Sequence, residues 1–557
     1  MFIVKSQVKN ILSLILNNLK KIYSKYFGLI FLLGVFNYFG YGFSRYIYGK
    51  YYEMPIYLKA LKISFGLFNM IMFFTFIFLF LSFFKEKIIE IFVKLFFALS
   101  LFLFLIDYFL VEKFNLSINE TTVQILAETN KNELFEFCNE NISTEIIVHV
   151  IILCLIIYII SKIKINIKSN KLLLAIFVLS FVQIFGIKSN IRALPLHRLF
   201  DGISNTIENN KIYKKIQSQI QDNVVLVRND SKIQNIILII GESTTKNHMS
   251  LYGYPKKTNV LLEKNKNIYK YTDVISPHAQ TIPSIKKILT FYNSDSDKEW
   301  YKYNNLIDIM KKSGYKTYWF SNQESSGLNG NLPAVIGSRS DLLLFNEKRD
   351  GQEAYGKYDE QIVLKSKKLL EKDKKNFVIY HLLGTHETYK NRYPKSFDKY
   401  SSKDYNYLGL KEKNKQIYAE YDNAVTYNDF VVNSIIELFK SENSVVIYLS
   451  DHAEEVYDFR NFSGHGEGNI SHYMVEIPFL IYVSDKFREN YPDKVEKIKE
   501  SVSRPYMTDD VIHTILDISD IETTEYDPTR SVINDKYIPR DRMLHGKSYD
   551  NYWKTLN

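Results

Sequence analysis

Long apolar runs dominate the first 200 positions of the chain. They read FLLGVFNYFGYGF, FNMIMFFTFIFLFLSFF, LFFALSLFLFLIDYFLV, IIVHVIILCLIIYII and LLLAIFVLSFVQIFGI. A helix that crosses ~30 Å of hydrocarbon needs ~20 mostly apolar residues. The pattern therefore predicts about five transmembrane helices, at residues 26–44, 62–84, 91–111, 144–161 and 171–188. Because no small-residue cleavage site follows the first of them, it is expected to be a signal anchor that stays in the protein.

The lysines around these runs predict the orientation of the chain. Basic residues gather in cytoplasmic loops. Five lysines precede the first run, and the second and fourth loops are also basic, whereas the third loop, at 112–143, is rich in glutamate. The first loop carries Arg45, Lys50, Lys59 and Lys62, which weakens the asymmetry without reversing it. We expect a cytoplasmic N-terminus and, after an odd number of spans, an exported C-terminal part.

A transporter is the first alternative for a protein with several spans. Transporters usually place ionisable groups in the middle of the membrane. Here only Asp107 and His149 come close to that position, and both are expected near the ends of spans. The sequence therefore argues against transport.

The pattern of apolar and polar residues changes after residue 190. Residues 191–230 alternate basic and apolar positions, which is typical of an interfacial helix or of a linker on a membrane surface. From residue 231 onward, short runs rich in Ile and Val alternate with helical patterns, as in NIILII, NFVIYHLL and SVVIYLS. Such runs predict a parallel sheet covered on both faces. The expected domains are a transmembrane part at 1–190, a linker at 191–230 and an exported α/β domain at 231–557.

Polar side chains follow several of these predicted strands. In open α/β sheets, ligands bind beyond the carboxyl ends of the strands. The polar residues expected at that edge are Glu242, Asn322, His386, Asp451 and His452. Each could be an ordinary loop residue, but four or more strand ends that carry metal-binding side chains together favour a functional site.

The ligand types at this edge point to a metal. Glu242 and Asp451 supply carboxylate oxygens, and His452 supplies an imidazole nitrogen. Mixed O/N ligands suit a catalytic Zn²⁺ site, and the absence of cysteine among them argues against a structural zinc. His386 and His465 could bind a second ion or donate to a phosphate.

The segment SPHAQTIPSIKKILT offers a candidate nucleophile, Thr281, at the start of a predicted helix. A helix N-terminus stabilises negative charge, so an attacking oxygen and an approaching phosphate would both be favoured there. The alternative is that Thr281 only caps the helix, and the local sequence leaves both interpretations open.

Net charge and cysteine content add little. The formal charge of +10 is explained by lysines at a cytoplasmic face, and no nucleic-acid-binding motif accompanies it. Both cysteines, Cys138 and Cys154, lie in the membrane part, so the α/β domain must be stable without disulfides.

Several motifs in order carry a family resemblance. The segments GESTTKNHMSLYGYPKKTNVLL, HAQTIPS, HLLGTHETYKNRYP, YDNAVTYNDF and SDHAEEVYDFRNFSGHGEG resemble those of the phosphoethanolamine transferases of Gram-negative envelopes. These are membrane-anchored members of the alkaline phosphatase/sulfatase superfamily. The resemblance implies five N-terminal helices in the inner membrane and a periplasmic sulfatase-like α/β domain.

The resemblance also implies roles for single residues. Glu242, Thr281, Asp451 and His452 would bind Zn²⁺, with Thr281 as the nucleophile. His386 and His465 would contact the phosphate of the donor, and Thr129 and Glu133 would lie near its ethanolamine.

The chain departs from the family pattern at a few positions. Ala453 stands where many relatives have Gly, Ile125 where some have Asn, and Asn329 near where some have Lys. The last two bear on contacts with the donor headgroup. The exported domain also lacks the cysteines that form disulfides in many relatives.

By this resemblance the expected reaction is transfer of phosphoethanolamine from phosphatidylethanolamine to lipid A or an inner-core sugar, through a phospho-threonine intermediate. A phosphoglycerol transferase of the lipoteichoic-acid-synthase type is the alternative. A formylglycine sulfatase is disfavoured, because Thr281 and Ile285 stand where that motif has Cys or Ser and Arg. A non-catalytic receptor domain is disfavoured because all four expected ligands are present.

Overall fold

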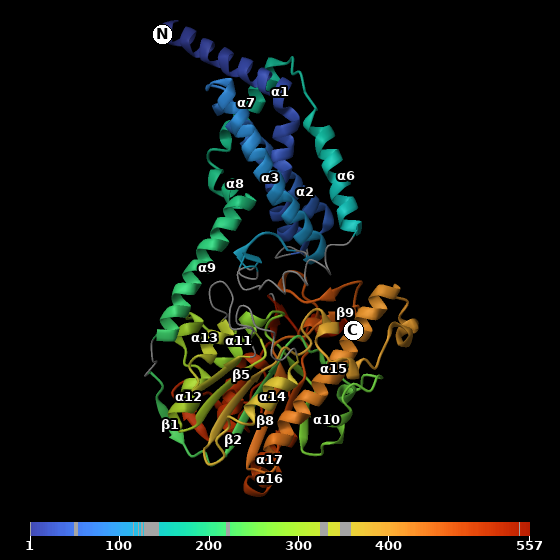
Figure 1. Ribbon diagram of the computed structural model, residues 1–557. Coiled ribbons are helices and arrows are strands. Elements are labelled where there is room, and N and C mark those ends of the chain that lie inside the picture. Colours follow the sequence, from blue (N-terminus) through green and yellow to red (C-terminus); the bar gives the residue numbers. More distant parts are fainter. Residues whose placement is uncertain are drawn as a thin grey trace. The chain divides into compact units, whose positions relative to one another are not determined.

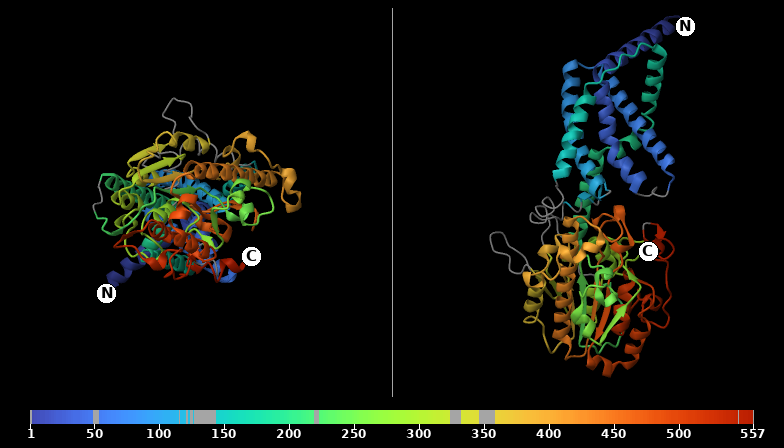
Figure 2. Two further views of the ribbon diagram at one scale, coloured as in Figure 1. Left: turned by 90° about the horizontal axis from the view of Figure 1, so that it is seen from below. Right: turned by 90° about the vertical axis from the view of Figure 1, so that its right-hand side faces the viewer.

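The computed structural model describes residues 2–48, 54–114, 116–120, 122–123, 126, 144–218, 223–323, 332–345, 358–544 and 546–556. The chain forms two compact units, Met1–Asn209 and Asn210–Asn557. The first unit is helical, and the second is built on a mixed β-sheet (Figures 1 and 2).

Long apolar helices make up the first unit. Its main helices are α1 (Phe2–Phe43), α2 (Ile56–Leu81), α3 (Glu86–Phe114), α6 (Thr144–Ser161), α7 (Asn170–Val182) and α8 (Ile187–Ala193). Within the described residues, three of them are long and apolar enough to cross a membrane, at Ser6–Ile47, Ile56–Leu81 and Ile89–Lys113. The apolar helix Ile146–Ser161 is shorter. The predicted number of five spans is therefore not confirmed.

The predicted span 171–188 is interrupted in the structure. α7 and α8 form a pair bent by 80° across the break at 183–186. The side chain of Gln183, which ends α7, donates to Asn69 of α2 and accepts from Asn190 of α8, both at 3.1 Å. These amide bonds satisfy polar groups where the helix stops, so the bend is stable in an apolar setting.

A buried ion pair ties α3 to α9 (Pro195–Ser218), which occupies much of the predicted linker. Asp107 is fully buried and its Oδ2 lies 2.6 Å from Nη2 of Arg198. Its Oδ1 accepts from the backbone N–H of Ile118 at 2.7 Å. The Asp107 side chain also contacts the backbone at Gly40 of α1, where any Cβ would lie 2.3 Å from the carboxyl group. Asp107 thus joins three segments of this unit.

The second unit contains a seven-stranded sheet in the order β3-β11-β8-β2-β7-β5-β6. The strands are β2 (Asn235–Gly241), β3 (Ile268–Tyr271), β5 (Lys316–Ser321), β6 (Leu342–Phe345), β7 (Asn376–His381), β8 (Ser444–Ser450) and β11 (Phe479–Val483). The five strands from β8 to β6 are parallel, whereas β11 pairs antiparallel with both β8 and β3. The predicted parallel sheet is thus present, with an antiparallel margin.

Helices cover both faces of this sheet, as the continuous apolar strands predict. Along β2, Ile236 and Leu238 pack into the core under α11 (Thr281–Leu289), α12 (Leu306–Lys312), α13 (Leu332–Gly337) and α18 (Val511–Ile518). Ile237 and Ile239 point to the opposite core, under α14 (Glu360–Ser366) and α15 (Glu412–Phe439). The smaller helices α10 (Val260–Lys264), α16 (Asp485–Asn490) and α17 (Pro492–Glu500) lie at the periphery (Figure 1).

Short strands complete the second unit. They pair as β1 (Leu226–Asn229) with β13 (Ile521–Thr523), β4 (Val274–Ile275) with β12 (Tyr506–Met507), β9 (Glu455–Val456) with β10 (Ser463–Gly464), and β14 (Met543–Leu544) with β15 (Lys547–Ser548). Because β2, β7 and β8 are parallel neighbours, their carboxyl ends lie at one edge of the sheet.

The Asp107–Arg198 pair yields a stability prediction. Asp107→Ala would leave the Arg198 guanidinium without its carboxylate in a buried place, which typically costs ~3–5 kcal/mol. We expect a clear loss of thermal stability in detergent micelles, measured by circular dichroism. Asp201→Ala, which removes an exposed carboxylate paired with His197, is the matched control and should change stability by less than ~1 kcal/mol. Equal stability of the two variants would contradict a structural role for the pair.

Candidate active site and metal centre

Three predicted ligands meet at the carboxyl edge of the sheet. Glu242 directly follows β2, and Asp451 and His452 directly follow β8. Their ligand atoms lie within 4.8 Å of one another, and all three residues are buried. His452 Nε2 is 3.0 Å from Oε1 of Glu242 and 3.6 Å from Oδ2 of Asp451. The neighbouring strand ends therefore bring two carboxylates and one imidazole together.

Backbone contacts hold these side chains in place. Asp451 Oδ1 accepts from the N–H groups of His452 at 2.7 Å and of Ser243 at 3.3 Å. The Nδ1 atom of His452 lies 3.0 Å from the carbonyl oxygen of Ala453, so Nδ1–H donates there and Nε2 faces the carboxylates. Burial lowers the pKa of His452, but Asp451 and Glu242 outweigh this and raise it to about 10. A metal ion that replaces the Nε2 proton would meet an imidazole already oriented through Nδ1, as metal-binding histidines usually are.

The electrostatics of the cluster favour a cation. Burial and the neighbouring Glu242 raise the pKa of Asp451 well above its ordinary value. Burial alone would also raise the pKa of Glu242, but His452 holds it below its ordinary range. Asp451 Oδ2 is buried and has no hydrogen-bond partner in the described part of the chain. A buried carboxylate oxygen without a donor, beside a second carboxylate and an imidazole nitrogen, fits a divalent ion such as Zn²⁺.

Thr281 lies against this cluster. It is the first residue of α11, and the N-cap position is taken by Gln280. Thr281 Oγ1 donates to Oε2 of Glu242 at 3.2 Å and lies 3.4 Å from His452 Nε2. Its hydroxyl thus faces the ligand set, which is a different placement from that of a helix cap.

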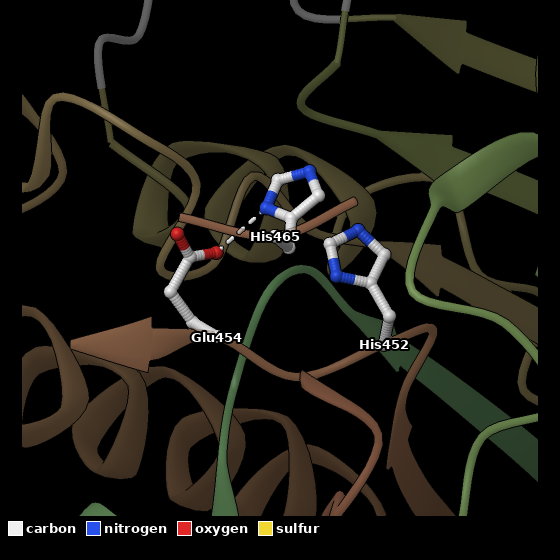
Figure 3. A group of neighbouring side chains, drawn as sticks. All are labelled: His452, Glu454 and His465. Carbon is white, nitrogen blue, oxygen red and sulfur yellow. Dashed lines mark hydrogen bonds and ion pairs between the residues drawn. The ribbon is translucent and has the colours of Figure 1, made fainter. Parts of the chain in front are cut away.

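His465 lies beside His452 and is linked to Glu454 (Figure 3). The two ring centroids are 4.1 Å apart, and Nδ1 of His465 is 2.7 Å from Oε2 of the buried Glu454. The other carboxylate oxygen of Glu454 accepts from the Tyr389 hydroxyl at 2.8 Å. His452, Glu454 and His465 together form a second group of possible metal ligands.

His386 is placed by an unusual loop after β7. Gly384 has φ +52°, and a Cβ there would lie 2.8 Å from the backbone N and O of Glu242. Asp359 accepts from the N–H groups of Leu383 and Gly384, both at 2.9 Å. Burial lowers the pKa of His386 to about 4, despite the opposing effect of the Glu242 carboxylate, and its buried Nδ1 atom makes no hydrogen bond to the described residues. His386 is therefore a neutral imidazole.

The other positions that the sequence singled out have different outcomes. Thr129 and Glu133, together with Ile125 and Asn329, fall outside the described residues. At the end of β5, the sequence pattern singled out Asn322, but the side chain of Asn322 bonds Asp359 at 2.8 Å. The next residue, Gln323, donates to Glu242 Oε2 at 3.1 Å.

Sequence reasoning also missed Tyr389, Glu454 and Asp359. Glu454 lies two positions after His452, in the motif SDHAEE, so its nearness to the strand end was a usable signal. For Tyr389 and Asp359, which come from distant loops, the sequence carried no such signal.

A buried histidine, His248, links helix α15 to the loop that contains Asp458. His248 Nδ1 is 2.5 Å from Asp422 of α15, and its Nε2 is 3.1 Å from Asp458, in the loop that follows Glu454. Three tyrosine rings surround it, at centroid distances of 4.9, 4.7 and 5.0 Å: Tyr254, Tyr418 and Tyr421. Burial lowers the pKa of His248, but the two carboxylates outweigh this and raise it to about 10.

Comparison with known proteins identifies related chains. The family described as Sulfatase matches residues 234–521, about half of the chain. Phosphoethanolamine transferase EptC of Escherichia coli (strain K12) is 34% identical over 319 residues, which cover 56% of this chain and 55% of that protein. Phosphoethanolamine transferase CptA of Salmonella typhimurium is 31% identical over 320 residues, with 56% and 55% covered. The chain spans about half the length of the curated relatives it matches.

Two solved structures are also similar. The C-terminal periplasmic domain of EptC from Escherichia coli, in complex with Zn, has a TM-score of 0.54 and 32% identity, and covers 58% of this chain and 96% of that chain. The lipooligosaccharide phosphoethanolamine transferase A from Neisseria meningitidis, an integral membrane protein, has a TM-score of 0.62 and 19% identity, with 90% and 97% covered. The second match extends the shared fold to both units and confirms the predicted order of a helical unit before a sulfatase-like one.

The His248 contacts predict a pH dependence of stability. Because the folded-state pKa of about 10 exceeds the ordinary ~6.5, the stabilisation is complete below about pH 6.5 and is lost as the pH rises towards 10. Wild-type protein should lose up to ~1.4 kcal/mol per pH unit in this window from His248 alone. Chemical denaturation of the wild type and of His248→Gln at several pH values measures this. A wild-type slope no steeper than that of the variant would contradict the charged state of His248.

Proposed function

The chain belongs to the sulfatase family, and from this premise we propose that it transfers phosphoethanolamine from phosphatidylethanolamine to lipid A or an inner-core sugar of an envelope glycolipid. The observation that carries the proposal is the hydroxyl of Thr281, which points into a cluster of two carboxylates and one imidazole. The names of the relatives, all phosphoethanolamine transferases, support the choice of the transferred group. The helices of the first unit suit two substrates that reside in a bilayer.

In this proposal Glu242, Asp451, His452 and Thr281 hold Zn²⁺. The ion would supply positive charge that lowers the pKa of a coordinated hydroxyl and offsets charge on the phosphate. Support comes from the unpartnered Oδ2 of Asp451, from Nε2 of His452, which faces both carboxylates, and from the relative whose periplasmic domain was solved with Zn. Gln323 holds Oε2 of Glu242 through its amide and so fixes the orientation of that carboxylate.

The transfer takes place in two steps, and each step uses particular side chains. Thr281 Oγ1 attacks the donor phosphorus, the bond from phosphorus to the diacylglycerol oxygen breaks, and the hydroxyl proton of Thr281 leaves toward the carboxylate it already faces, Glu242. His465, whose Nδ1 is held by Glu454, presents Nε2 to protonate the leaving oxygen. The acceptor hydroxyl then attacks the same phosphorus and gives its proton to Nε2 of His465. The bond from phosphorus to Thr281 Oγ1 breaks, and Thr281 takes its proton back from Glu242. Splitting the transfer in two lets one site serve two bulky lipids in turn.

His386 would contact the donor phosphate as a neutral donor. Thr129 and Glu133 are proposed to lie near the ethanolamine on the basis of the family resemblance alone. The proposed location is the inner membrane, with the catalytic unit in the periplasm, as in the relative whose solved domain is described as periplasmic.

Replacement of Thr281 separates the nucleophile from other roles. Thr281→Ala should reduce release of diacylglycerol from phosphatidylethanolamine by roughly 10³-fold or more, because no group remains to attack phosphorus. Thr281→Ser should keep part of the rate. Thr290→Ala removes a hydroxyl at the other end of α11, which donates to the carbonyl oxygen of Lys286 and accepts from the N–H of Tyr292, and is the matched control.

The donor-only reaction should also leave a phosphoethanolamine adduct on the peptide that contains Thr281, detected by mass spectrometry. Near wild-type turnover of the donor by Thr281→Ala would exclude the covalent route. Glycolipids from cells with and without the protein would show the acceptor: added phosphoethanolamine supports the proposal, and added phosphoglycerol would replace it with the lipoteichoic-acid-type reaction.

Metal content tests the ligand set independently of activity. Asp451→Ala and His452→Ala should each lower the zinc content of the purified protein, measured by elemental mass spectrometry, while the far-ultraviolet circular dichroism spectrum stays unchanged. The sheet is packed by apolar side chains, so removing one ligand leaves its core intact. Glu489→Ala, at an exposed site in α16, is the control. Undiminished zinc in both ligand variants would refute this assignment.

A further inference from the structure

Helix α1 is much longer than a membrane is thick. Its 42 residues extend over about 63 Å at 1.5 Å per residue, whereas the hydrocarbon core of a bilayer measures ~30 Å. About half of the helix must therefore lie outside the hydrocarbon. The charges and contacts along α1 show which half this is.

Two parts of the helical unit contact α1 near its middle: the connection between α6 and α7, and the start of α3. The α6–α7 connection contacts it directly: Ile165 N donates to Tyr23 O at 3.1 Å, and Gly28 N donates to Ile163 O at 3.0 Å. The side chain of Lys25 forms an ion pair with Glu86, the first residue of α3. Lysines gather at both places: Lys85 and Lys87 at the start of α3, and Lys162, Lys164 and Lys168 in the α6–α7 connection. Because basic connections lie at the cytoplasmic surface, residues 19–28 of α1 lie at that level and residues 2–18 lie beyond it.

The segment beyond the boundary is amphipathic. Val8, Ile11 and Ile15 follow helical spacing on one face. Lys9, Ser13 and Asn17, each four positions apart, lie on the opposite face. Val8 and Ile11 are each 59% exposed, so the described residues leave the outer part of this apolar face uncovered. In Figures 1 and 2 this end of α1 inclines away from α2 and α3.

The charge of the segment is of one sign. Residues 2–25 contain Lys5, Lys9, Lys20, Lys21 and Lys25, and the first acidic residue of the chain is Glu53. Lys9, Lys20 and Lys21 are exposed. An apolar face flanked by lysines is the pattern of a helix that lies in the plane of an anionic membrane surface.

We propose that residues 2–18 of α1 lie on the membrane surface with Val8 and Ile11 immersed among the acyl chains, and that Lys9, together with Lys20 and Lys21 at the boundary, attracts anionic phospholipid headgroups. The occupant of the apolar face is thus lipid. The surface is independent of the catalytic cluster, so its failure would leave the proposed transfer untouched.

Spin labels on the full-length protein test this placement. In a background with Cys138→Ser and Cys154→Ser, single labels are attached at Ile11→Cys and, as the matched control on the polar face, at Ser13→Cys. The proteins are reconstituted in vesicles of phosphatidylcholine, with or without phosphatidylglycerol. Collision rates with oxygen, which partitions into lipid, and with a water-soluble nickel chelate are then measured.

The expected result is a several-fold higher ratio of oxygen to nickel collisions at position 11 than at position 13. Phosphatidylglycerol should raise the ratio at position 11, and Lys9→Gln with Lys20→Gln and Lys21→Gln should abolish that rise. Equal, water-like ratios at both positions would overturn the proposal. So would protection of position 11 from both reagents, which would indicate packing against a second copy. An oxygen-to-nickel ratio at position 11 that is the same with and without phosphatidylglycerol would overturn the assignment to anionic headgroups.

Discussion

The burial of two neighbouring carboxylates, Glu242 and Asp451, is the main electrostatic constraint on the sulfatase-like unit. Glu242 and Asp451 are both buried, and each lies beside the same imidazole nitrogen of His452. Burial of one charged carboxylate is costly and burial of two is more so, unless a cation compensates them. The parallel pairing of β2 with β8 fixes this encounter, because it aligns Gly241 with Ser450 and so places the two following residues side by side.

The loops around Glu242 and Asp451 have unusual backbone conformations that hold these two residues together. Ser243 adopts φ +57°, which is uncommon for a residue with a side chain, and in that conformation its N–H reaches Asp451. Gly384 approaches the backbone of Glu242 so closely that no side chain would fit. Behind these loops, Tyr421 donates to the carbonyl oxygen of Ser243 and accepts from the N–H of Thr245. Local strain at the cluster is thus held by packing and hydrogen bonds further away.

Sequence patterns predicted the parts of the site that depend on a strand end. Glu242, Asp451 and His452 follow runs of β-branched residues, and ligands gather beyond the carboxyl ends of such strands, so the sequence alone predicts that the three residues lie together. The bend between α7 and α8 was not predictable from the pattern. Apolar composition indicates a continuous run, whereas the amide contacts of Gln183 with α2 and α8, which accompany the bend, are tertiary. Contacts between distant loops, as of Tyr389 with Glu454, were equally beyond local sequence.

The two units differ in how their buried carboxylates are compensated. In the helical unit, Asp107 meets the guanidinium of Arg198 and a backbone N–H, so its charge is matched within the chain. In the sulfatase-like unit, one imidazole faces two carboxylates, so with both carboxylates ionised even a protonated His452 leaves the group with excess negative charge. An arginine there would complete the balance permanently and would occupy the space in front of Thr281. A cluster with a deficit of positive charge instead keeps a place for an exchangeable cation, and through it for the phosphate that the threonine is proposed to attack.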